Sequence, residues 1–447
     1  MDGTARRTRA LAATAGVIVA LGLVGASANP ASADPSPRAG VTTRVSVNST
    51  GEQANGYSYE TSISADGRWV AFSSEATNLV PGDTNDAEDV FVRDRMTGTT
   101  QRVSVRTDGS QGDGMSGRYW LGISADGQYV AFWSLATNLV GDDTNERSDV
   151  FVRDLVAGTT QRVSIGSGGQ ANRDSYGSAI SANGRYVAFY SGARNLVADD
   201  TNQSEDVFVR DLVAGTTRRV SVGPGGRQAN SGSFDPAISA DGRHVAFVSR
   251  ASNLVAGDTL RTLDVFVRDL VAGRTRRVSM GVGGQQPGNS SHSPVITAHG
   301  RHVAFHSYAG NLVAEDDNRL PDVFVRDLAT ATTRRVSVGP GGRDGNFSSY
   351  SPAISANGRY VAFHSFASNL MAGDTNNESD IFVRDRGTAT TRRVSIGPNG
   401  QQANRDSYSP AISADGPQVA FESYASNLVA GDTNDTADIF VRTRNLQ

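Results

Sequence analysis

Aspartate and asparagine recur in a short pattern, Asp-x-Asn-x-x-x-Asp, whose oxygen atoms could bind a metal ion. Oxygen ligands at positions 1, 3 and 7 suit calcium, which takes about six to eight oxygens. Position 5, a usual ligand in calcium loops, varies from Ala87 to Arg147 and Leu320. Side-chain bonds that hold a loop are therefore the alternative, which we favour. The pattern occurs at Asp83/Asn85/Asp89, Asp143/Asn145/Asp149, Asp200/Asn202/Asp206, Asp316/Asn318/Asp322, Asp374/Asn376/Asp380 and Asp432/Asn434/Asp438.

Aromatic side chains occupy a second recurring position, four residues before a repeated isoleucine. They are Tyr59, Tyr119, Tyr176, Phe234, His292, Tyr350 and Tyr408, and Trp120, Trp133 and Tyr190 add to them. Exposed rings with Asn, Gln and Arg nearby could bind a sugar or a peptide, which makes these residues candidate ligand-binding residues. Burial between neighbouring repeats is the alternative that we favour.

No catalytic motif accompanies these residues. The chain has no Gly-x-Ser-x-Gly, no His-Glu-x-x-His and no phosphate-binding loop. It also has no cysteine and no lysine, which excludes thiolate metal sites and Schiff-base chemistry. His306, His364 and Glu422 share one position in three successive repeats, but neighbouring repeats would hold them about 9–10 Å apart, too far for one ion.

The candidate residues belong to a unit that occurs seven times. The run from Ile63 to Phe72 returns in altered form from Ile123, Ile180, Ile238, Ile296, Ile354 and Ile412, at intervals of 57–60 residues. Each unit contains four short runs typical of strands, and an Asp-Gly pair such as Asp241-Gly242 predicts a type I′ hairpin, with positive φ at both central residues. Four antiparallel strands per unit, without helical periodicity, indicate an all-β, seven-bladed β-propeller.

The two ends of the repeat region predict how the ring closes. The last unit stops at Thr443 in its third strand, whereas residues 43–47 precede the first unit and match a fourth strand. We therefore predict that residues 41–447 form one propeller, closed by the N-terminal strand completing the seventh blade. Loops between fourth and first strands, and between second and third, share one face. The acidic loops and the aromatic positions should lie on this loop-rich face, opposite the Asp-Gly hairpins.

Residues 1–33 are organised as a secretory signal peptide, and residues 34–40 would be a short linker. Arg6, Arg7 and Arg9 precede an apolar run, and small residues at 26–28 and 31–33 offer cleavage sites. Because the apolar run is shorter than the ~20 residues that a membrane span needs, we expect a secreted protein without membrane attachment after cleavage. The net charge of −4, with both signs interspersed, disfavours nucleic acid as a partner.

The repeats resemble the TolB-type, WD-like propeller repeat. The resemblance covers residues 41–447 and rests on Ser-Ala-Asp-Gly-Arg, as at Ser64–Arg68, and on Asp-Val-Phe-Val-Arg-Asp, as at Asp89–Asp94. It implies a propeller that binds proteins or peptides at its channel mouth, and it implies no single chemistry.

We interpret the chain as a monomeric, non-enzymatic platform that binds a protein, peptide or glycan through its loop-rich channel face. It would need no cofactor, although calcium could bind the acidic loops. Two alternatives stay open. A hydrolase or lyase acting on polysaccharide needs an asymmetric cluster of acids and bases around the channel, and a lectin-like protein needs repeated exposed rings.

Overall fold

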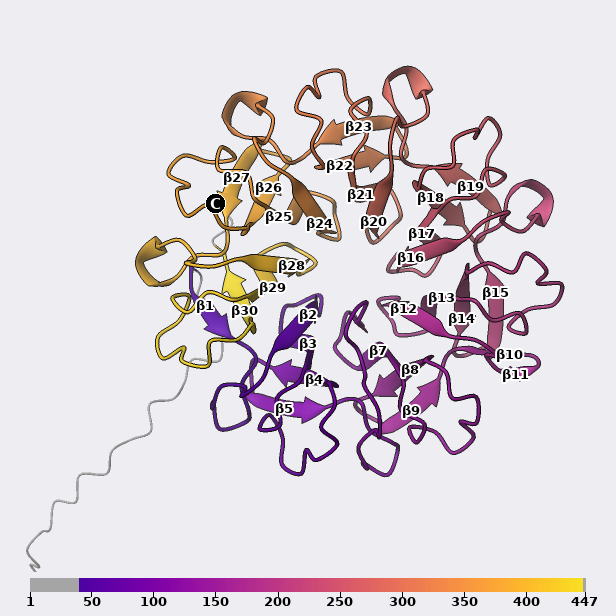
Figure 1. The fold of residues 1–447 in the computed structure, drawn as a ribbon, viewed down its shortest axis with the longest axis horizontal. Helices are drawn as coiled ribbons and strands as arrows, with labels where there is room; N and C mark the ends of the chain where they lie inside the picture. The colour runs from indigo at the N-terminus through magenta and orange to yellow at the C-terminus, as the bar shows by residue number, and fades with distance from the viewer. Residues whose placement is uncertain (1–39, 445–447) are drawn as a thin grey trace, which may run out of the picture. The chain divides into compact units, whose positions relative to one another are not determined.

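The computed structural model describes residues 40–444, which form seven four-stranded antiparallel sheets, or blades, around a central axis (Figure 1). This architecture confirms the predicted all-β, seven-bladed propeller. The predicted signal peptide, residues 1–33, lies outside the described residues. Within the described part of the chain, no helix has the length and apolar character needed to cross a membrane.

Each blade runs from an innermost strand at the channel to an outer strand at the circumference. The innermost strands of blades 1 to 7 are β2 (Ser58–Ile63), β6 (Gly122–Ile123), β12 (Ser175–Ile180), β16 (Ser233–Ile238), β20 (Ser291–Ile296), β24 (Ser349–Ile354) and β28 (Ser407–Ile412). The second strands are β3 (Trp69–Ser74), β7 (Tyr129–Ser134), β13 (Tyr186–Ser191), β17 (His244–Ser249), β21 (His302–Ser307), β25 (Tyr360–Ser365) and β29 (Gln418–Ser423).

The third strands carry the Asp-Val-Phe-Val-Arg-Asp pattern or a close variant. They are β4 (Asp89–Asp94), β8 (Asp149–Asp154), β14 (Asp206–Asp211), β18 (Asp264–Asp269), β22 (Asp322–Asp327), β26 (Asp380–Asp385) and β30 (Asp438–Thr443). The outer strands are β5 (Thr99–Arg102), β9 (Thr159–Arg162), β15 (Thr216–Arg219), β19 (Arg274–Arg277), β23 (Thr332–Arg335), β27 (Thr390–Arg393) and, for blade 7, β1 (Thr42–Arg44). The loops between blades add a small hairpin, β10 (Ile165–Gly166) and β11 (Gly169–Gln170), and the 3-10 turns η1 (Pro224–Gly226), η2 (Val282–Gly284), η3 (Pro340–Gly342) and η4 (Pro398–Gly400).

Strand β1 closes the ring as predicted. It pairs with β30 in antiparallel register, with Thr43 opposite Val441. Beyond the strand, the Ser46 hydroxyl donates to Asp438 Oδ1 over 2.5 Å. Ser104 makes the equivalent bond to Asp89 within blade 1. The N-terminal segment therefore reproduces the fourth strand of the other blades, including its side-chain contact.

The core lies between neighbouring blades. Val90 and Val92 of blade 1 pack against Phe132 of blade 2. Ala71 and Phe72 point to opposite faces of β3, toward blades 2 and 7, and both are fully buried. Because both faces of the inner strands are covered, their sequences are continuous apolar runs in place of an apolar–polar alternation.

The Asp-Gly hairpins differ from the predicted type I′ turn. Gly67 has a φ of +73°, but Asp66 does not have a positive φ. The Gly67 N–H donates to Ser64 O over 3.0 Å. Asp66 Oδ1 accepts hydrogen bonds from the Ser64 hydroxyl (2.6 Å) and from the Arg68 N–H (2.9 Å). These side-chain bonds hold Asp66 in a conformation that a type I′ turn excludes.

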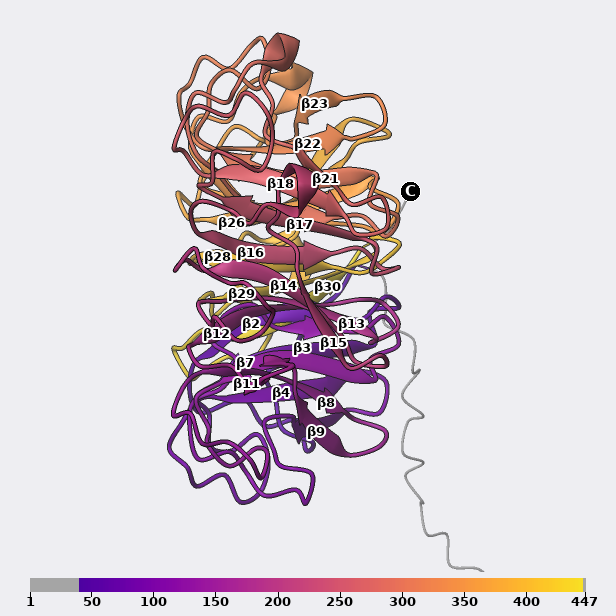
Figure 2. The same cartoon turned by 90° about the vertical axis from the view of Figure 1, so that its right-hand side faces the viewer.

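The two faces of the ring differ as expected from the strand order, and Figure 2 shows the ring edge-on. On the loop-rich face, Asn78 Nδ2 from the loop after β3 donates to Gln53 O in the loop before β2, over 2.9 Å. On the opposite face, the Arg68 guanidinium makes two bonds to the Asp94 carboxylate, of 2.8 and 2.6 Å. The repeated Ser-Ala-Asp-Gly-Arg run thus builds the hairpin face.

Candidate functional site at the channel mouth

Each acidic loop surrounds a buried arginine. In blade 6, Arg393 Nη1 lies 3.3 Å from Asp374 Oδ1 and 2.8 Å from Asp380 Oδ2. Asn376 Nδ2 donates to the same Asp380 oxygen over 3.0 Å. Burial raises the pKa of Asp380, and the Arg393 charge opposes this shift. The residues of the predicted metal pattern therefore do come together, around a guanidinium group.

The asparagine of the pattern uses all of its polar atoms to hold the loop. Asn85 Nδ2 donates to Asp89 Oδ2 over 3.2 Å and to Gly112 O over 2.9 Å, and its Oδ1 accepts the Ala87 N–H over 3.3 Å. Asparagine can offer only this amide oxygen to a cation, and the oxygen already closes an Asx turn.

The asparagines of the other Asp-x-Asn loops make the same three bonds. The amide nitrogen donates to the aspartate at the start of the third strand and to a backbone carbonyl in the loop before the next blade, and the amide oxygen accepts the N–H of the residue two positions later. This arrangement favours the loop-holding role of the asparagines, because their amide oxygens are bonded to backbone and their amide nitrogens face the carboxylates. The asparagines of the predicted calcium sites, whose metal binding stays a prediction, are Asn85, Asn145, Asn202, Asn376 and Asn434.

The same arrangement of carboxylates around a guanidinium occurs in all seven blades. The arginines are Arg44, Arg102, Arg162, Arg219, Arg277, Arg335 and Arg393. Among residues 40–444, no group of three or more His, Asp or Glu side chains is placed to hold a metal ion. This geometry favours the loop-holding role, because calcium would have to displace the arginine. Calcium binding stays a prediction, which calorimetric titration of metal-stripped protein tests.

The aromatic position is occupied differently in blade 2. In blade 1, Tyr59 lies opposite Ser73 of the second strand. In blade 2 the equivalent residue is Gly117, whose N–H donates to Trp133 O over 2.9 Å. A Cβ on Gly117 would lie 2.2 Å from Val90 Cγ2, so this position has no room for a side chain. The assignment of Tyr119 to the recurring aromatic position was therefore wrong. That position was counted back four residues from the repeat isoleucine, and the count ignores an insertion in blade 2.

The insertion comprises residues 118–121 and replaces the two residues, 60–61, that blade 1 has between the same paired positions. We call it the blade-2 insertion. Trp120 within it has a φ of +57°, a strained conformation for a bulky side chain. The backbone N–H and the hydroxyl of Ser178 both donate to Trp120 O, over 3.1 and 2.5 Å. Blade 3 thus holds the strained residue in place.

The blade-2 insertion presents two aromatic rings at the surface. Tyr119 is 51% exposed and Trp120 is 38% exposed. The Trp120 ring meets Tyr190 edge to face, with 5.7 Å between centroids. Trp133 is buried beneath them: its Nε1 donates to Tyr119 O over 3.0 Å, and Tyr176 packs on its ring at 5.3 Å. The structure therefore brings five predicted residues into one cluster, with Tyr119 and Trp120 as its exposed part.

The remaining predicted aromatic residues form a second series, in which Tyr and His rings alternate. Tyr350 lies between His306 and His364, at 5.3 and 5.6 Å, and Tyr408 packs on His364 at 5.3 Å. His292 stacks on His306, and its ring, like those of Tyr350 and Tyr408, is half-buried. Burial lowers the pKa of His306 to about 3 and that of His364 to about 4, so both are neutral at pH 7. Because Tyr350 separates the two histidines, they do not meet at one metal ion.

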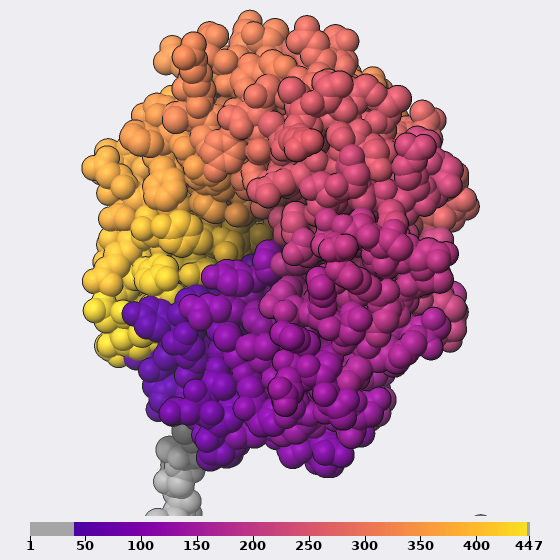
Figure 3. Space-filling model, turned by 45° about the vertical axis from the view of Figure 1, so that its right-hand side comes forward, coloured from indigo at the N-terminus to yellow at the C-terminus, as the bar shows by residue number. Residues whose placement is uncertain are grey.

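The sequence analysis missed two acidic residues at the channel, Glu60 and Asp235, and considered a third acid near them, Glu422, only as a metal ligand. Glu60 and Asp235 line a cavity of about 280 Å³ at the centre of the ring, together with Trp120. Figure 3 shows the hollow where the indigo and yellow surfaces meet. Burial raises the pKa of Glu60 to about 7 and that of Asp235 to about 6. Burial and then the Glu60 charge raise the pKa of Glu422 to about 8.

A comparison of the repeats could have found Glu60 and Asp235. The position of Glu60 and Asp235 carries Gly177 in blade 3 and serine in blades 5 to 7 (Ser293, Ser351 and Ser409). Acids therefore occur at this position in only two blades. Only the tertiary structure shows that the position faces a common channel.

A fourth acid lies beside the blade-2 insertion. Glu88 is 5% exposed, and within the described residues neither of its carboxylate oxygens has a hydrogen-bond partner. Its oxygen Oε2 lies 4.0 Å from Arg118 Nε. Burial raises the pKa of Glu88 to about 7. Arg118 also lies over the Tyr59 ring, 5.5 Å from its centroid. The insertion thus combines exposed rings with an arginine and a buried acid.

The comparisons with known proteins support the class of protein, a seven-bladed β-propeller. No family model and no curated protein matches the chain. An oligogalacturonate lyase in complex with manganese is similar in structure, with a TM-score of 0.54 and 13% identity over 91% of this chain and 93% of that chain. The β-propeller domain of the Trilobed protease from Pyrococcus furiosus gives 0.52 and 9% over 87% and 95%. These identities support a shared fold only.

TolB from Acinetobacter baumannii also matches, with a TM-score of 0.40 and 12% identity over 80% of this chain and 66% of that chain. We draw no conclusion from a TM-score this low. Membership of the TolB-type family therefore stays a prediction from the repeat motifs.

Proposed function

We propose that this protein is a secreted, non-enzymatic platform that binds a protein, peptide or glycan at its channel mouth, on the loop-rich face. The observation that supports this proposal is the blade-2 insertion. It interrupts the repeat and exposes two aromatic rings beside Arg118 and Glu88. The positive φ of Trp120 does not distinguish this blade, because the equivalent residues Glu60 and Ser351 also have a positive φ.

Among the predicted aromatic positions, exposure favours the blade-2 insertion over equivalent sites in every blade. In the predicted ring of positions, Tyr176, Tyr350 and Tyr408 are half-buried and packed against neighbouring rings. A lectin-like protein with one site per blade would need such rings at the surface. We therefore expect a single ligand at the channel mouth of each chain.

The experiment is a glycan array with a parallel peptide pulldown, performed on wild type, Trp120→Gly and Phe347→Ala. Glycine suits the positive φ of Trp120 and occurs as Gly177 at the matching position of blade 3, so Trp120→Gly should fold. Phe347 is a matched control because it is a 59% exposed aromatic residue of another inter-blade loop. We expect Trp120→Gly to lose a ligand that Phe347→Ala retains. Equal binding by both variants would refute the proposal.

The channel acids favour a second candidate, an enzyme that cleaves polysaccharide. Glu60, Asp235 and Glu422 break the repeat symmetry, and the raised pKa values of Glu60 and Glu422 suit an acid that is protonated near neutral pH. Cleavage of a glycosidic bond commonly uses two carboxyl groups. The test measures reducing ends released from a panel of polysaccharides. Release by wild type that Glu422→Gln abolishes would favour the enzyme over the platform.

A further inference from the structure

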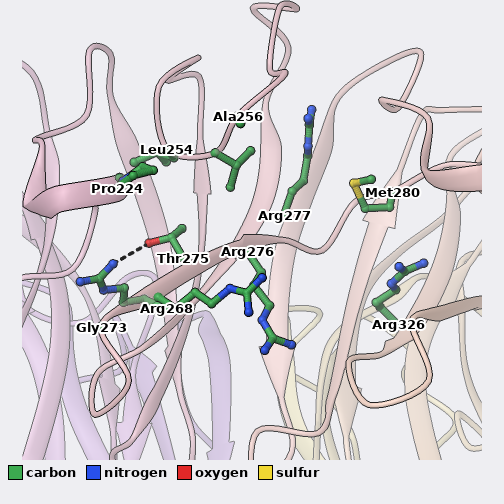
Figure 4. A pocket seen from close by; sticks show the side chains of 13 residues that line it. Pro224, Leu254, Ala256, Arg268, Gly273, Thr275, Arg276, Arg277, Met280 and Arg326 are labelled. Atoms are coloured by element: carbon green, nitrogen blue, oxygen red, sulfur yellow. Dashed lines mark hydrogen bonds between the residues drawn. The ribbon is translucent and has the colours of Figure 1, made fainter.

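A second cavity, of about 500 Å³, lies at the circumference of blade 4, far along the sheet from the channel. It is formed by the outer strand β19, the loop after β17 and η1, with Arg326 of blade 5 at its far side. Figure 4 shows Arg268, Arg276 and Arg326 below the loop residues Leu254 and Ala256. We call this cavity the rim pocket.

Most arginines of the rim pocket have no acidic partner. Within the described part of the chain, Arg277 pairs with Asp258 and Asp264 and so belongs to the loop network. Arg268, Arg274, Arg276 and Arg326 line the same pocket, and none of them forms an ion pair with another described residue. Four guanidinium groups without a direct ion pair favour the approach of an anion.

The contacts of the pocket arginines leave donor groups free. Arg268 Nη1 donates to Thr275 Oγ1 over 3.1 Å, and Arg326 Nη1 donates to Thr333 Oγ1 over 2.9 Å. These neutral partners orient the side chains and leave their charges uncompensated. Burial, and then the charge of nearby Arg218, lowers the pKa of Arg268. Arg218 and Arg268 therefore repel each other, Asp269 opposes this effect in part, and an anion beside Arg268 would reduce the repulsion further.

Comparison of the blades shows that two of the arginines are dispensable for the fold. The residue equivalent to Arg276 is Gln101 in blade 1 and Gln161 in blade 2. The residue equivalent to Arg274 is threonine in every other described outer strand of blades 1 to 6: Thr99, Thr159, Thr216, Thr332 and Thr390. Only Arg274 is particular to blade 4, because Arg218, Arg334 and Arg392 occupy the position of Arg276 in blades 3, 5 and 6.

Apolar side chains form another part of the pocket wall. Pro224, Val255 and Met280 line it. Guanidinium groups bind carboxylates through paired hydrogen bonds, and the C–H faces of sugar rings pack on apolar side chains. A phosphate polymer would use the charges but has no apolar face for this wall. An acidic peptide would contact these apolar side chains only through the one or two methylene groups of its Asp or Glu side chains.

We propose that the rim pocket binds a carboxylated oligosaccharide, with its carboxylates on Arg268, Arg274 and Arg276 and a sugar face on Met280. This site is separate from the channel mouth and does not depend on the function proposed for it. It makes the propeller a protein with two ligand sites, one aromatic and one cationic.

The test is calorimetric titration of oligomannuronate into the full chain and into the double variant Arg274→Thr/Arg276→Gln. Both substitutions use residues that other blades carry at these positions, so the variant should keep its melting temperature. The matched control is Arg392→Gln, which removes the exposed arginine that blade 6 carries at the position of Arg276. We expect affinity to fall at least about tenfold in the double variant and to stay unchanged in the control, because two charge-assisted contacts are lost.

Further outcomes decide the ligand class. Reduction of the carboxylates to alcohols should abolish binding, and salt should weaken it. Equal affinity for polyphosphate or for poly-glutamate would overturn the assignment to an acidic glycan. An equal loss in Arg392→Gln would also overturn it, because diffuse charge on the outer strands would then explain binding. The alternative role of these arginines is to protect the exposed outer strand from pairing with other molecules. If that were their only role, the wild-type protein would not bind the oligosaccharide, and the proposal would be overturned.

Discussion

Glu422 is a buried carboxyl group in β29, adjacent to Glu60 of blade 1. Its pKa in the folded protein is about 8, compared with 4.5 for a free glutamate. The folded state therefore binds more protons than the unfolded state between these values, and this contribution to stability is complete below about pH 4.5 and is lost as the pH rises through 8. His306 and His364 have the opposite effect on the pH dependence of stability. Burial lowers their pKa values in the folded protein to about 3 and about 4, so their contribution to stability is lost as the pH falls below 6.5.

Glu422→Gln separates these effects, since the histidines are common to both proteins. We expect the variant to gain roughly 2–4 kcal/mol relative to wild type between about pH 5 and about pH 9. Urea denaturation at the two pH values measures this gain. Exchange of the exposed Glu52 for Gln is the control and should give no such difference. A constant free-energy difference between Glu422→Gln and wild type would contradict the assigned environment of Glu422.

Arg393 neutralises Asp374 and Asp380 in the acidic loop of blade 6. Arg393→Met would leave two buried carboxyl groups without their counter-charge, at a cost of about 3 kcal/mol in the free energy of unfolding. The exposed neighbour Arg392 provides the control, because its replacement by Gln should change stability by less than about 0.5 kcal/mol. Matching urea midpoints for Arg393→Met and wild type would show that the arginine does not hold the loop.

At the scale of the element, the Asp-Gly hairpins are also contacts between blades. A Cβ on Gly127 would lie 2.2 Å from the Trp69 ring of the preceding blade, and one on Gly184 would lie 2.1 Å from the Tyr129 ring. The repeated glycine therefore serves two purposes: it adopts a positive φ, and it allows an aromatic side chain of the neighbouring blade to lie across the turn.

Gly127→Ala tests both purposes, and Gly82→Ala is its control. Gly82 has a similar φ of +73°, but nothing lies within 4 Å of its Cβ position. We expect Gly82→Ala to cost about 1 kcal/mol for the backbone alone. Gly127→Ala should cost about 1–3 kcal/mol more, because Trp69 must move. Thermal and urea unfolding of the two variants measure the difference, and equal losses would remove the packing explanation.

At the scale of the whole molecule, stability depends on joining the two ends of the repeat region. Strand β1 covers the edge of β30, which would otherwise expose unpaired backbone groups. Deletion of residues 41–47 should abolish the cooperative thermal transition. Removal of residues 1–33 alone is the control. A transition that is unchanged by the longer deletion would refute closure through β1.

The sequence alone determined the architecture of the ring. Seven units of nearly constant length, four strand-like runs in each and an unmatched strand before the first unit led to the blade count and to the closure, because repetition makes each local signal count seven times. The acidic loops were also located correctly. Their arginine partners were missed, because Arg393 lies 13 residues beyond Asp380 and only strand pairing brings the two together.

Only the tertiary structure decided which residues meet at the channel. Glu60, Asp235 and Trp120 belong to different blades and share one cavity because the ring closes around it. The tertiary structure also decided the strand register in blade 2. Gly117 pairs with Trp133, and this pairing shows that the blade-2 insertion displaces Tyr119 from the recurring aromatic position. A repeat pattern defines each blade by itself, whereas a binding site here is formed by side chains from several blades, at positions that only the closed ring brings together.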